Sequence, residues 1–223
     1  INNFNGIKKG PVIFFGNEFF DAIPIKQFKR INGSLLEKNY TLDKNYKIKE
    51  VFKKVSKANI KIIGSYKSLK NLKFIELPKL GLQELRKITK KISKLKGCIL
   101  MIDYGYLKPN SQDTLQSVMK HKKNNLLKNL GKADITAHVN FSLLNEFFLK
   151  ENLKIKNIIS QKKFLENMGI LERAKIIAKK MRFSEQSNLY LRLKRLLSPK
   201  SMGSLFKVIL AYKFNNNKFF GFN

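Results

Sequence analysis

Short apolar runs alternate with amphipathic segments along the first half of the chain. Residues 11–17 begin as an apolar run after a Gly-Pro pair and end in polar residues, which predicts a buried strand. Residues 82–95 place leucine and isoleucine at helical spacing, which predicts an amphipathic helix with a basic outer face that ends at Gly97. A second buried strand is expected in the run CILMI, breaking at Asp103. This order indicates an α/β protein with a parallel core sheet.

The second half of the chain carries weaker patterns. Residues 133–141 alternate between apolar and polar side chains, which predicts a half-exposed strand or the edge of a cleft. Residues 142–151 are expected to form a helix capped by Ser142. The other predicted elements are a hairpin near 46–55, a short strand at 154–160, a helical stretch at 161–180 interrupted at Gly169, and an antiparallel edge strand at 206–214.

The charge of the chain is strongly unbalanced. Lys and Arg number 46 against 15 Asp and Glu, a formal net charge of +31. One interpretation is a surface that binds polyanions. The other is a drift toward A/T-rich codons, which enriches lysine together with asparagine, isoleucine and phenylalanine. We favour the second, because the lysines are spread along the chain and outnumber the arginines that bidentate recognition prefers. Non-specific, salt-sensitive binding to polyanions is expected in either case.

The cysteine content, the length of the apolar runs and the N-terminal sequence also bear on the kind of protein. The single cysteine, Cys98, excludes an internal disulfide and a Cys-cluster zinc site, and no metal site is predicted. No apolar run approaches the ~20 residues of a membrane helix, so no membrane span is expected. The N-terminus has no apolar signal segment and no initiator methionine, which suggests that Ile1 is not the natural start.

Two predicted strands end in acidic residues. Asn17 and Glu18 follow the first strand, and Asp103 and Tyr104 follow the second. If the strands are neighbours, their carboxyl ends meet in one crevice, where ligands of open α/β sheets bind. Buried carboxylates need a partner, and a sulfonium, guanidinium or ammonium ligand would supply one. The alternative is that Glu18 caps a helix with Asp21 three residues on, and the pattern alone does not decide between them.

Several ordered motifs resemble one enzyme family. The run GNEFFDAIPIKQF is similar to its "NE-(F/L)-(F/L)-DA-(L/I)-P" signature, and GCILMIDYGY to its "DYGY" strand. The segments TLQ and DITAHVNF, then QKKFLENMGILER and MGSLFKVIL, resemble its later blocks in the expected order. The match is colinear from about residue 11 to about residue 212. The chain thus resembles the MidA-type S-adenosylmethionine (SAM)-dependent methyltransferases, which include the mitochondrial arginine methyltransferase that assists complex I assembly.

The resemblance implies a fold and a domain organisation. It implies a class I SAM-methyltransferase Rossmann-like sheet, of which this α/β chain carries the C-terminal half, about strands four to seven, with inserted helices and a hairpin. No glycine-rich loop precedes Pro11. Residues 1–223 are therefore expected to be the C-terminal part of one methyltransferase domain, without its N-terminal SAM-binding half. The strand at 12–16 would then have a bare, apolar edge that is prone to aggregation.

The resemblance also implies SAM as cofactor and a protein arginine as methyl acceptor in the complete protein. Glu18 is expected to anchor the guanidinium, with Asp21 in support, as the two catalytic residues. The expected cofactor neighbours are Asn17, Glu18 and Phe19. The expected lining of the substrate cleft is Asn17, Asp103, Tyr104, His121, Asp134 and His138. Each of these could instead have an ordinary structural role, and a lone histidine such as His138 more often does.

The family also suggests partners and a location. A respiratory complex I subunit is a candidate substrate, and the protein is expected in the mitochondrial matrix of a eukaryote or the cytoplasm of a bacterium. Two alternatives stay open from the sequence. One is a basic nucleic-acid-binding module, against which stands the lack of a regular arginine and aromatic pattern. The other is a non-catalytic remnant with an assembly or chaperone-like role.

Overall fold

The computed structural model describes residues 6–120, 122–215 and 218–222. A central mixed sheet has the strand order β1 (Ile13–Asn17), β6 (Cys98–Tyr106), β13 (Phe206–Tyr212) and β11 (Lys154–Ile155). β1 runs parallel to β6, whereas β13 runs antiparallel to it. The predicted parallel pair of acidic-tipped strands is confirmed. The predicted late strand is antiparallel as expected, but its place at the edge is wrong, because β13 pairs with β6 on one side and with β11 on the other.

Two short strands complete this sheet. β12 (Ile159–Ser160) pairs with β13, and β10 (Val139–Asn140) pairs with the far end of β6. The expectation that the second strand breaks at Asp103 is wrong, because β6 continues to Tyr106 and pairs there with β10. Gly105 makes this possible, since the chain of β10 passes directly over it: an added Cβ would lie 2.0 Å from the carbonyl oxygen of Val139.

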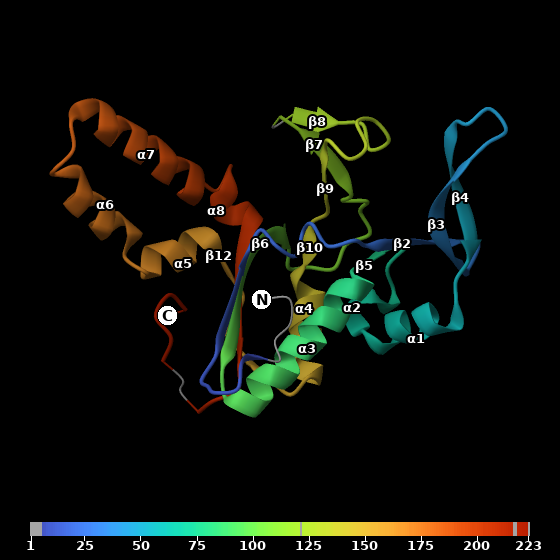
Figure 1. The fold of residues 1–223 in the computed structure, drawn as a ribbon, viewed down its shortest axis with the longest axis horizontal. Coiled ribbons are helices and arrows are strands. Elements are labelled where there is room, and N and C mark those ends of the chain that lie inside the picture. Colours follow the sequence, from blue (N-terminus) through green and yellow to red (C-terminus); the bar gives the residue numbers. More distant parts are fainter. Residues whose placement is uncertain (1–5, 121, 216–217, 223) are drawn as a thin grey trace.

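Helices cover one face of the central sheet (Figure 1). The predicted amphipathic helix is confirmed as α3 (Lys79–Leu95), and α4 (Phe141–Lys150) lies beside it. Their apolar side chains join the largest hydrophobic core. The predicted Ser142 cap of α4 is wrong: the cap is Asn140, whose side-chain oxygen accepts the backbone N–H of Leu143 at 3.0 Å.

A second sheet extends to the side of the core (Figure 1). Its strand order is β4 (Ile48–Lys54), β3 (Ser34–Leu42), β2 (Lys26–Ile31) and β5 (Phe74–Leu77), all antiparallel. We call it the side sheet. The predicted hairpin is confirmed as β3 and β4, and α1 (Lys57–Ser65) and α2 (Lys67–Lys70) connect β4 to β5.

Two further units stand above the carboxyl ends of β1 and β6 (Figure 1). One is a three-stranded sheet of β8 (Lys122–Asn124), β7 (Gln116–Met119) and β9 (Asp134–Thr136). The other, which we call the helical arm, contains α5 (Gln161–Asn167), α6 (Ile170–Ala178), α7 (Phe183–Leu197) and α8 (Met202–Leu205). The predicted interruption at Gly169 is confirmed, and this residue adopts a left-handed φ of 77°.

The predicted strand at 133–141 is only partly confirmed. It is divided into β9 and β10, with a short non-strand segment between them. Ile135, assigned to the apolar face, is 44% exposed, whereas Asn140 from the polar face is buried. The simple alternation fails because this segment crosses from one sheet to another and so changes its neighbours midway.

The edge of the central sheet at β1 is free among the described residues. The strand is confirmed, but it is not fully buried: Ile13 is 77% exposed and Phe15 is 65% exposed. Phe14, between them, packs against the main core. One face of β1 is therefore covered and the other is not. No helix among the described ranges is long and apolar enough to cross a membrane.

The close passage of β10 over β6 gives a stability prediction. Gly105→Ala should lower the free energy of unfolding by about 3 kcal/mol, because the new methyl group meets backbone atoms that cannot turn aside. Gly64→Ala in α1 is the matched control, since nothing lies within 4 Å of its added Cβ. It should raise the free energy by about 0.5–1 kcal/mol. Urea unfolding of both variants measures the contrast, and equal effects would contradict it.

Candidate functional site

A buried carboxylate at the end of β6 organises the loop that follows β1. Asp103 is 1% exposed, and its Oδ2 atom accepts the backbone N–H groups of Phe20 at 2.9 Å and Asp21 at 3.3 Å. Its Oδ1 atom accepts the backbone N–H of Tyr104 at 2.9 Å. Three backbone donors thus stabilise one carboxylate. The loop of residues 18–21 is held against the end of β6 as a result.

The loop begins with a residue in an unusual conformation. Glu18 has a φ of 46°, in the left-handed region that side chains other than glycine rarely adopt. Its backbone N–H donates to the carbonyl oxygen of Ile102 at 3.0 Å, which continues the parallel pairing of β1 with β6. The chain turns sharply at this point, and the Glu18 side chain reaches the solvent-accessible cavity above the sheet.

The buried Asp21 and the half-buried Tyr104 form a pair beside that cavity. The Tyr104 hydroxyl donates to Asp21 Oδ2 at 2.6 Å. Burial, together with this bond, raises the pKa of Tyr104 above its ordinary value, so the phenol stays protonated. The Tyr104 ring also meets the imidazole of His138 edge-on, with centroids 5.4 Å apart. These contacts join the loop after β1, strand β6 and the segment between β9 and β10.

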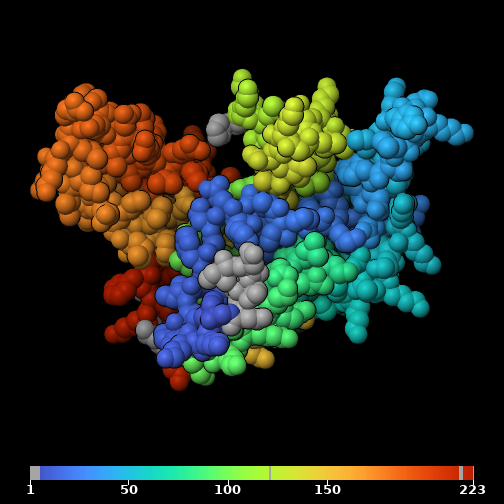
Figure 2. Space-filling model, in the orientation of Figure 1, coloured from blue at the N-terminus to red at the C-terminus, as the bar shows by residue number. Residues whose placement is uncertain are grey.

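The cavity has a volume of about 650 Å³ and lies at the carboxyl ends of β1 and β6. The three-stranded sheet forms one side and α7 and α8 of the helical arm form the other. Figure 2 shows the arm in orange and the three-stranded sheet in yellow-green, standing apart above the N-terminal part of the chain in blue. The predicted site residues that line the cavity are Glu18, Asp21, Tyr104, Asp134 and His138.

A much smaller cavity, of about 20 Å³, lies behind the first. Asp21 and His138 line both cavities, and Asn140 lines only the small one. Among the described residues, Asp21 Oδ1 and Asn140 Nδ2 are buried without a hydrogen-bond partner. The small cavity has room for one water molecule, and these two atoms are suitable partners for it.

The carboxylates of the large cavity lack basic partners. The ion pairs within the described residues use other acidic groups, and none involves Glu18, Asp21 or Asp134. In a chain with a net charge of +31, three unpaired carboxylates in one cavity mark a locally acidic site. Arg195 of α7 lines the same cavity and is its one arginine among the described lining residues. Such a cavity suits a cationic ligand.

Besides Tyr104, two groups near the cavity have pKa values that differ from their ordinary values. Burial, with the nearby Asp21 carboxylate, raises the pKa of Asp103 to about 6, against the lowering effect of its backbone hydrogen bonds. Burial, with the charge of Lys207, lowers the pKa of His138 below its ordinary value. His138 is therefore a neutral imidazole at pH 7.

The remaining predicted site residues lie elsewhere. Asp103 is buried beneath the loop and holds backbone groups. Asn17 and Phe19 are exposed beside the loop and are not among the described residues that line the cavity. Their predicted contacts with a cofactor stay predictions. His121 lies outside the described residues.

Several residues of the cavity were not predicted from the sequence. Gln116 of β7 donates to the Thr136 hydroxyl of β9 at 3.3 Å, and both line the cavity. These residues belong to the TLQ and DITAHV motifs, so the motifs were a usable signal. Arg195 and Phe206 also line the cavity. Nothing local in the sequence points to Arg195, because only the fold of the helical arm brings it to the site.

Comparison with known proteins decides the family. A family model described as an S-adenosyl-L-methionine-dependent methyltransferase matches residues 1–159. The chain belongs to this methyltransferase family. The predicted resemblance is therefore confirmed, and with it the dependence of the family on SAM.

Relatives in animals have similar sequences. The mitochondrial protein arginine methyltransferase NDUFAF7 of Danio rerio is 26% identical over 201 residues, covering 90% of this chain and 47% of that protein. The human protein of the same name is 27% identical over 203 residues, covering 90% and 45%. The Caenorhabditis elegans homolog is 30% identical over 172 residues, covering 75% and 39%. The chain thus spans about half the length of these relatives or less.

A solved structure shares the fold of this methyltransferase chain. A Burkholderia thailandensis protein, crystallised with bound S-adenosyl-homocysteine, matches with a TM-score of 0.80 at 22% identity. The match covers 96% of this chain and 56% of that one. The predicted class I methyltransferase-like α/β fold is confirmed by this likeness together with the parallel pair in the sheet.

The raised pKa of Asp103 predicts a pH-dependent stability. The folded state binds a proton at Asp103 more tightly than the unfolded state, whose pKa is near 3.8. This tighter proton binding stabilises the folded state by about 3 kcal/mol below pH 3.8. The stabilisation is lost as the pH rises through about 6 and Asp103 ionises. Asp103→Asn removes this titration. The difference in unfolding free energy, wild type minus variant, should fall between pH 4 and pH 7 in urea titrations.

Gly64→Ala in α1, which changes no titratable group, is the control for that measurement. Its difference from the wild type should stay flat over the same pH range. A flat difference for Asp103→Asn as well would show that the buried carboxylate does not titrate in this window.

Proposed function

We propose that the complete protein methylates arginine side chains of a protein substrate, with the guanidinium bound in the acidic cavity. The observation that carries this proposal is the group of unpaired carboxylates, Glu18, Asp21 and Asp134, in a strongly basic chain. A guanidinium offers five N–H donors in a planar fork that fits carboxylates. The names of the animal relatives support arginine as the acceptor.

The residues divide this task by their positions. Glu18 extends from the strained turn after β1, and Asp134 faces the same cavity from β9. Asp21 is fixed by Tyr104 and adds negative charge from behind. The two outer carboxylates therefore contact the guanidinium, and Asp21 supports them electrostatically. Cation binding in a partly enclosed cavity gains more from such charges than it would in open water.

The same residues fit the sulfonium of SAM. An acidic cavity next to the end of β1 accepts the positive charge of a sulfonium as well as that of a guanidinium. Asn17, Glu18 and Phe19 are the residues of this chain proposed to border the bound cofactor. When bound, SAM supplies an electrophilic methyl group for in-line displacement and leaves as S-adenosylhomocysteine. The loop of residues 18–21 keeps the acceptor close to that methyl group.

We also propose that this chain is the C-terminal part of the methyltransferase domain, and that β1 pairs with a strand of the SAM-binding half. The free edge of β1 and its exposed Ile13 and Phe15 support this arrangement. Phe15→Lys should weaken binding between this chain and a separately expressed N-terminal half, measured by calorimetry. Leu42→Lys, another exposed apolar position, on the side sheet, should leave that binding unchanged. No loss with Phe15→Lys would argue against pairing at β1.

The names of the relatives support a class of substrate and a location. A protein substrate agrees with the names of the animal relatives, and those proteins are named as mitochondrial. We propose a respiratory complex I subunit as substrate and the mitochondrial matrix as location if the source is eukaryotic, or the cytoplasm if it is bacterial. Non-specific binding to polyanions stays a prediction from the net charge of +31.

Charge removal in the cavity tests the proposed activity. Glu18→Gln and Asp134→Asn in the full-length protein should each lower methyl transfer from labelled SAM to arginine by about tenfold or more, because each removes a charge-assisted contact of about 1.5–3 kcal/mol. Acid hydrolysis of the labelled products identifies methylarginine. The matched control is Glu84→Gln. It removes an exposed carboxylate of α3, a helix that does not line the cavity among the described residues.

The outcomes test whether the cavity binds the guanidinium and whether arginine is the methyl acceptor. Loss in the cavity variants with full activity in Glu84→Gln supports guanidinium binding by the acidic cavity. Label on a residue other than arginine would contradict arginine as the acceptor. Full activity in both cavity variants would remove the cavity from the reaction.

A further inference from the structure

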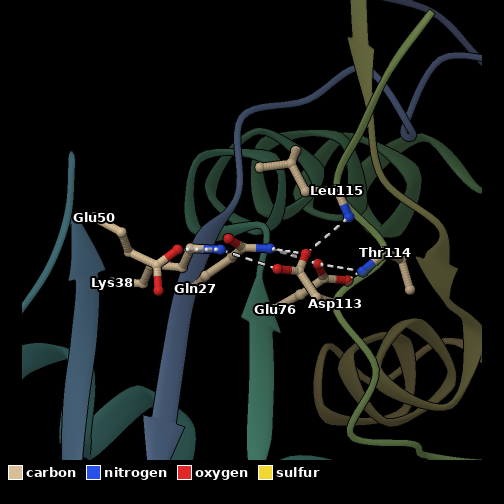
Figure 3. Close-up of polar contacts among 7 residues, drawn as sticks. All are labelled: Gln27, Lys38, Glu50, Glu76, Asp113, Thr114 and Leu115. Carbon is tan, nitrogen blue, oxygen red and sulfur yellow. Dashed lines mark hydrogen bonds and ion pairs between the residues drawn. The ribbon is translucent and has the colours of Figure 1, made fainter. Parts of the chain in front are cut away.

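A buried polar network joins the side sheet to the wall of the cavity (Figure 3). Glu76 of β5 is 6% exposed. Its carboxylate accepts Gln27 Nε2 at 2.9 Å, the backbone N–H of Thr114 at 3.0 Å and the Thr114 hydroxyl. Burial raises the pKa of Glu76, and these hydrogen bonds oppose that rise. A buried carboxylate with three donors fixes the segment that provides them.

A second carboxylate anchors the same segment. Asp113 Oδ1 accepts Gln27 Nε2 at 2.6 Å and the backbone N–H of Leu115 at 3.2 Å. Its Oδ2 atom lies 3.0 Å from Lys38 Nζ, which also pairs with Glu50 at 3.1 Å. Figure 3 shows these contacts running from β4 and β3 to the chain that follows β6. Residues 113–115 are thus tied to three strands of the side sheet.

Thr114 connects the anchored segment to His138, which lines the cavity. Its hydroxyl oxygen accepts the backbone N–H of His138 at 3.0 Å. The preceding N–H, of Ala137, donates to the backbone carbonyl oxygen of Asp21 at 3.0 Å. Two successive N–H groups are therefore held by different partners, one on the loop after β1 and one on residue 114. The backbone position of His138 depends on both.

His138 lines both cavities together with several charged groups. Asp21 lines both cavities with it, Glu18 and Asp134 line the large one, and Glu76 lines the small one. The Tyr104 ring meets the imidazole edge-on, Arg195 of the helical arm lines the large cavity, and the charge of Lys207 on β13 acts on the ring. Because burial and Lys207 lower its pKa, the ring is uncharged at pH 7 and one ring nitrogen is free to accept a proton.

We propose that His138 is the proton acceptor for the bound guanidinium, and that Thr114 and Glu76 are positioning residues that hold it there. The proposal rests on the proposed arginine methylation. A guanidinium nitrogen that gains a methyl group and remains singly charged must release one proton. That proton passes to the unprotonated ring nitrogen of His138, which later releases it to solvent. The total charge is conserved and the carboxylates stay ionised, because the imidazole gains the positive charge that the sulfonium of SAM loses with its methyl group.

The division of labour between imidazole and carboxylates follows from charge. Glu18 and Asp134 hold the cation only while they are ionised, so a carboxylate that took the proton would release its own ligand. A neutral imidazole can take the proton without lowering the negative charge that binds the substrate. His138 contacts the reacting group, whereas Thr114 and Glu76 act through it.

Substitution of the imidazole tests the catalytic part. His138→Asn in the full-length protein should lower the rate of methyl transfer from labelled SAM by roughly 100-fold, within the range of general-base catalysis. Binding of S-adenosylhomocysteine, measured by calorimetry, should stay unchanged. The wild-type rate should fall on the acid side as His138 is protonated, and the residual rate of the variant should lack that fall. An unchanged acid limb in His138→Asn would overturn the role.

Substitution of the hydroxyl tests the positioning part without relying on activity. The chain has two histidines, so the NMR signal of His138 is the one that His138→Asn removes. Thr114→Val keeps the size of the side chain but removes the acceptor for the His138 N–H. The pKa of His138 should then move toward the ordinary value of about 6.5, because the freed segment admits water. Thr114→Ser should keep the wild-type titration.

The results distinguish this inference from the proposed function. A wild-type protein that labels no arginine contradicts the proposed function itself. A wild type that labels arginine, with His138→Asn equally active, leaves that function in place and overturns the proton acceptor. If His138→Asn lowers the rate but His138 has the same pKa in the wild type and in Thr114→Val, only the positioning role of Thr114 is overturned.

Discussion

Three backbone N–H groups converge on the buried carboxylate of Asp103, and the arrangement of the cavity depends on that convergence. Parallel pairing of β1 with β6 brings the two strand ends together, but it does not determine the path of the loop that follows. The carboxylate does so, by drawing Phe20 inward and setting Asp21 where Tyr104 can reach it. Burial of the charge is unfavourable, and the backbone hydrogen bonds offset that cost only in part, as the raised pKa of Asp103 shows.

The sequence was informative where a local pattern has one structural outcome. An apolar run with polar residues at its end predicted each core strand, and the helical spacing predicted α3. The meeting of Glu18 and Tyr104 at one cavity was also predictable, because the carboxyl ends of adjacent parallel strands coincide. Sequence motifs supplied the family, which no periodicity could have supplied.

The rest depended on contacts between distant segments. The role of Asp103 could not be read from its position after an apolar run, since an inward and an outward carboxylate look alike in sequence. Thr114 reaches His138 only because the side sheet holds its segment through Glu76. Ser142 looked like a helix cap, but Asn140 took that place when β10 formed immediately before the helix. Tertiary neighbours decided each of these cases.

The exposed apolar side chains of β1 should make the association of this polypeptide depend on its concentration. Among the residues described, no strand pairs with the outer side of β1, and such an exposed edge can pair with an extended segment of another chain. At high concentration the other chain is a second copy of the same polypeptide, whereas at low concentration such encounters are rare. Turbidity and sedimentation of the isolated polypeptide would then vary with dilution, although its interior stays the same.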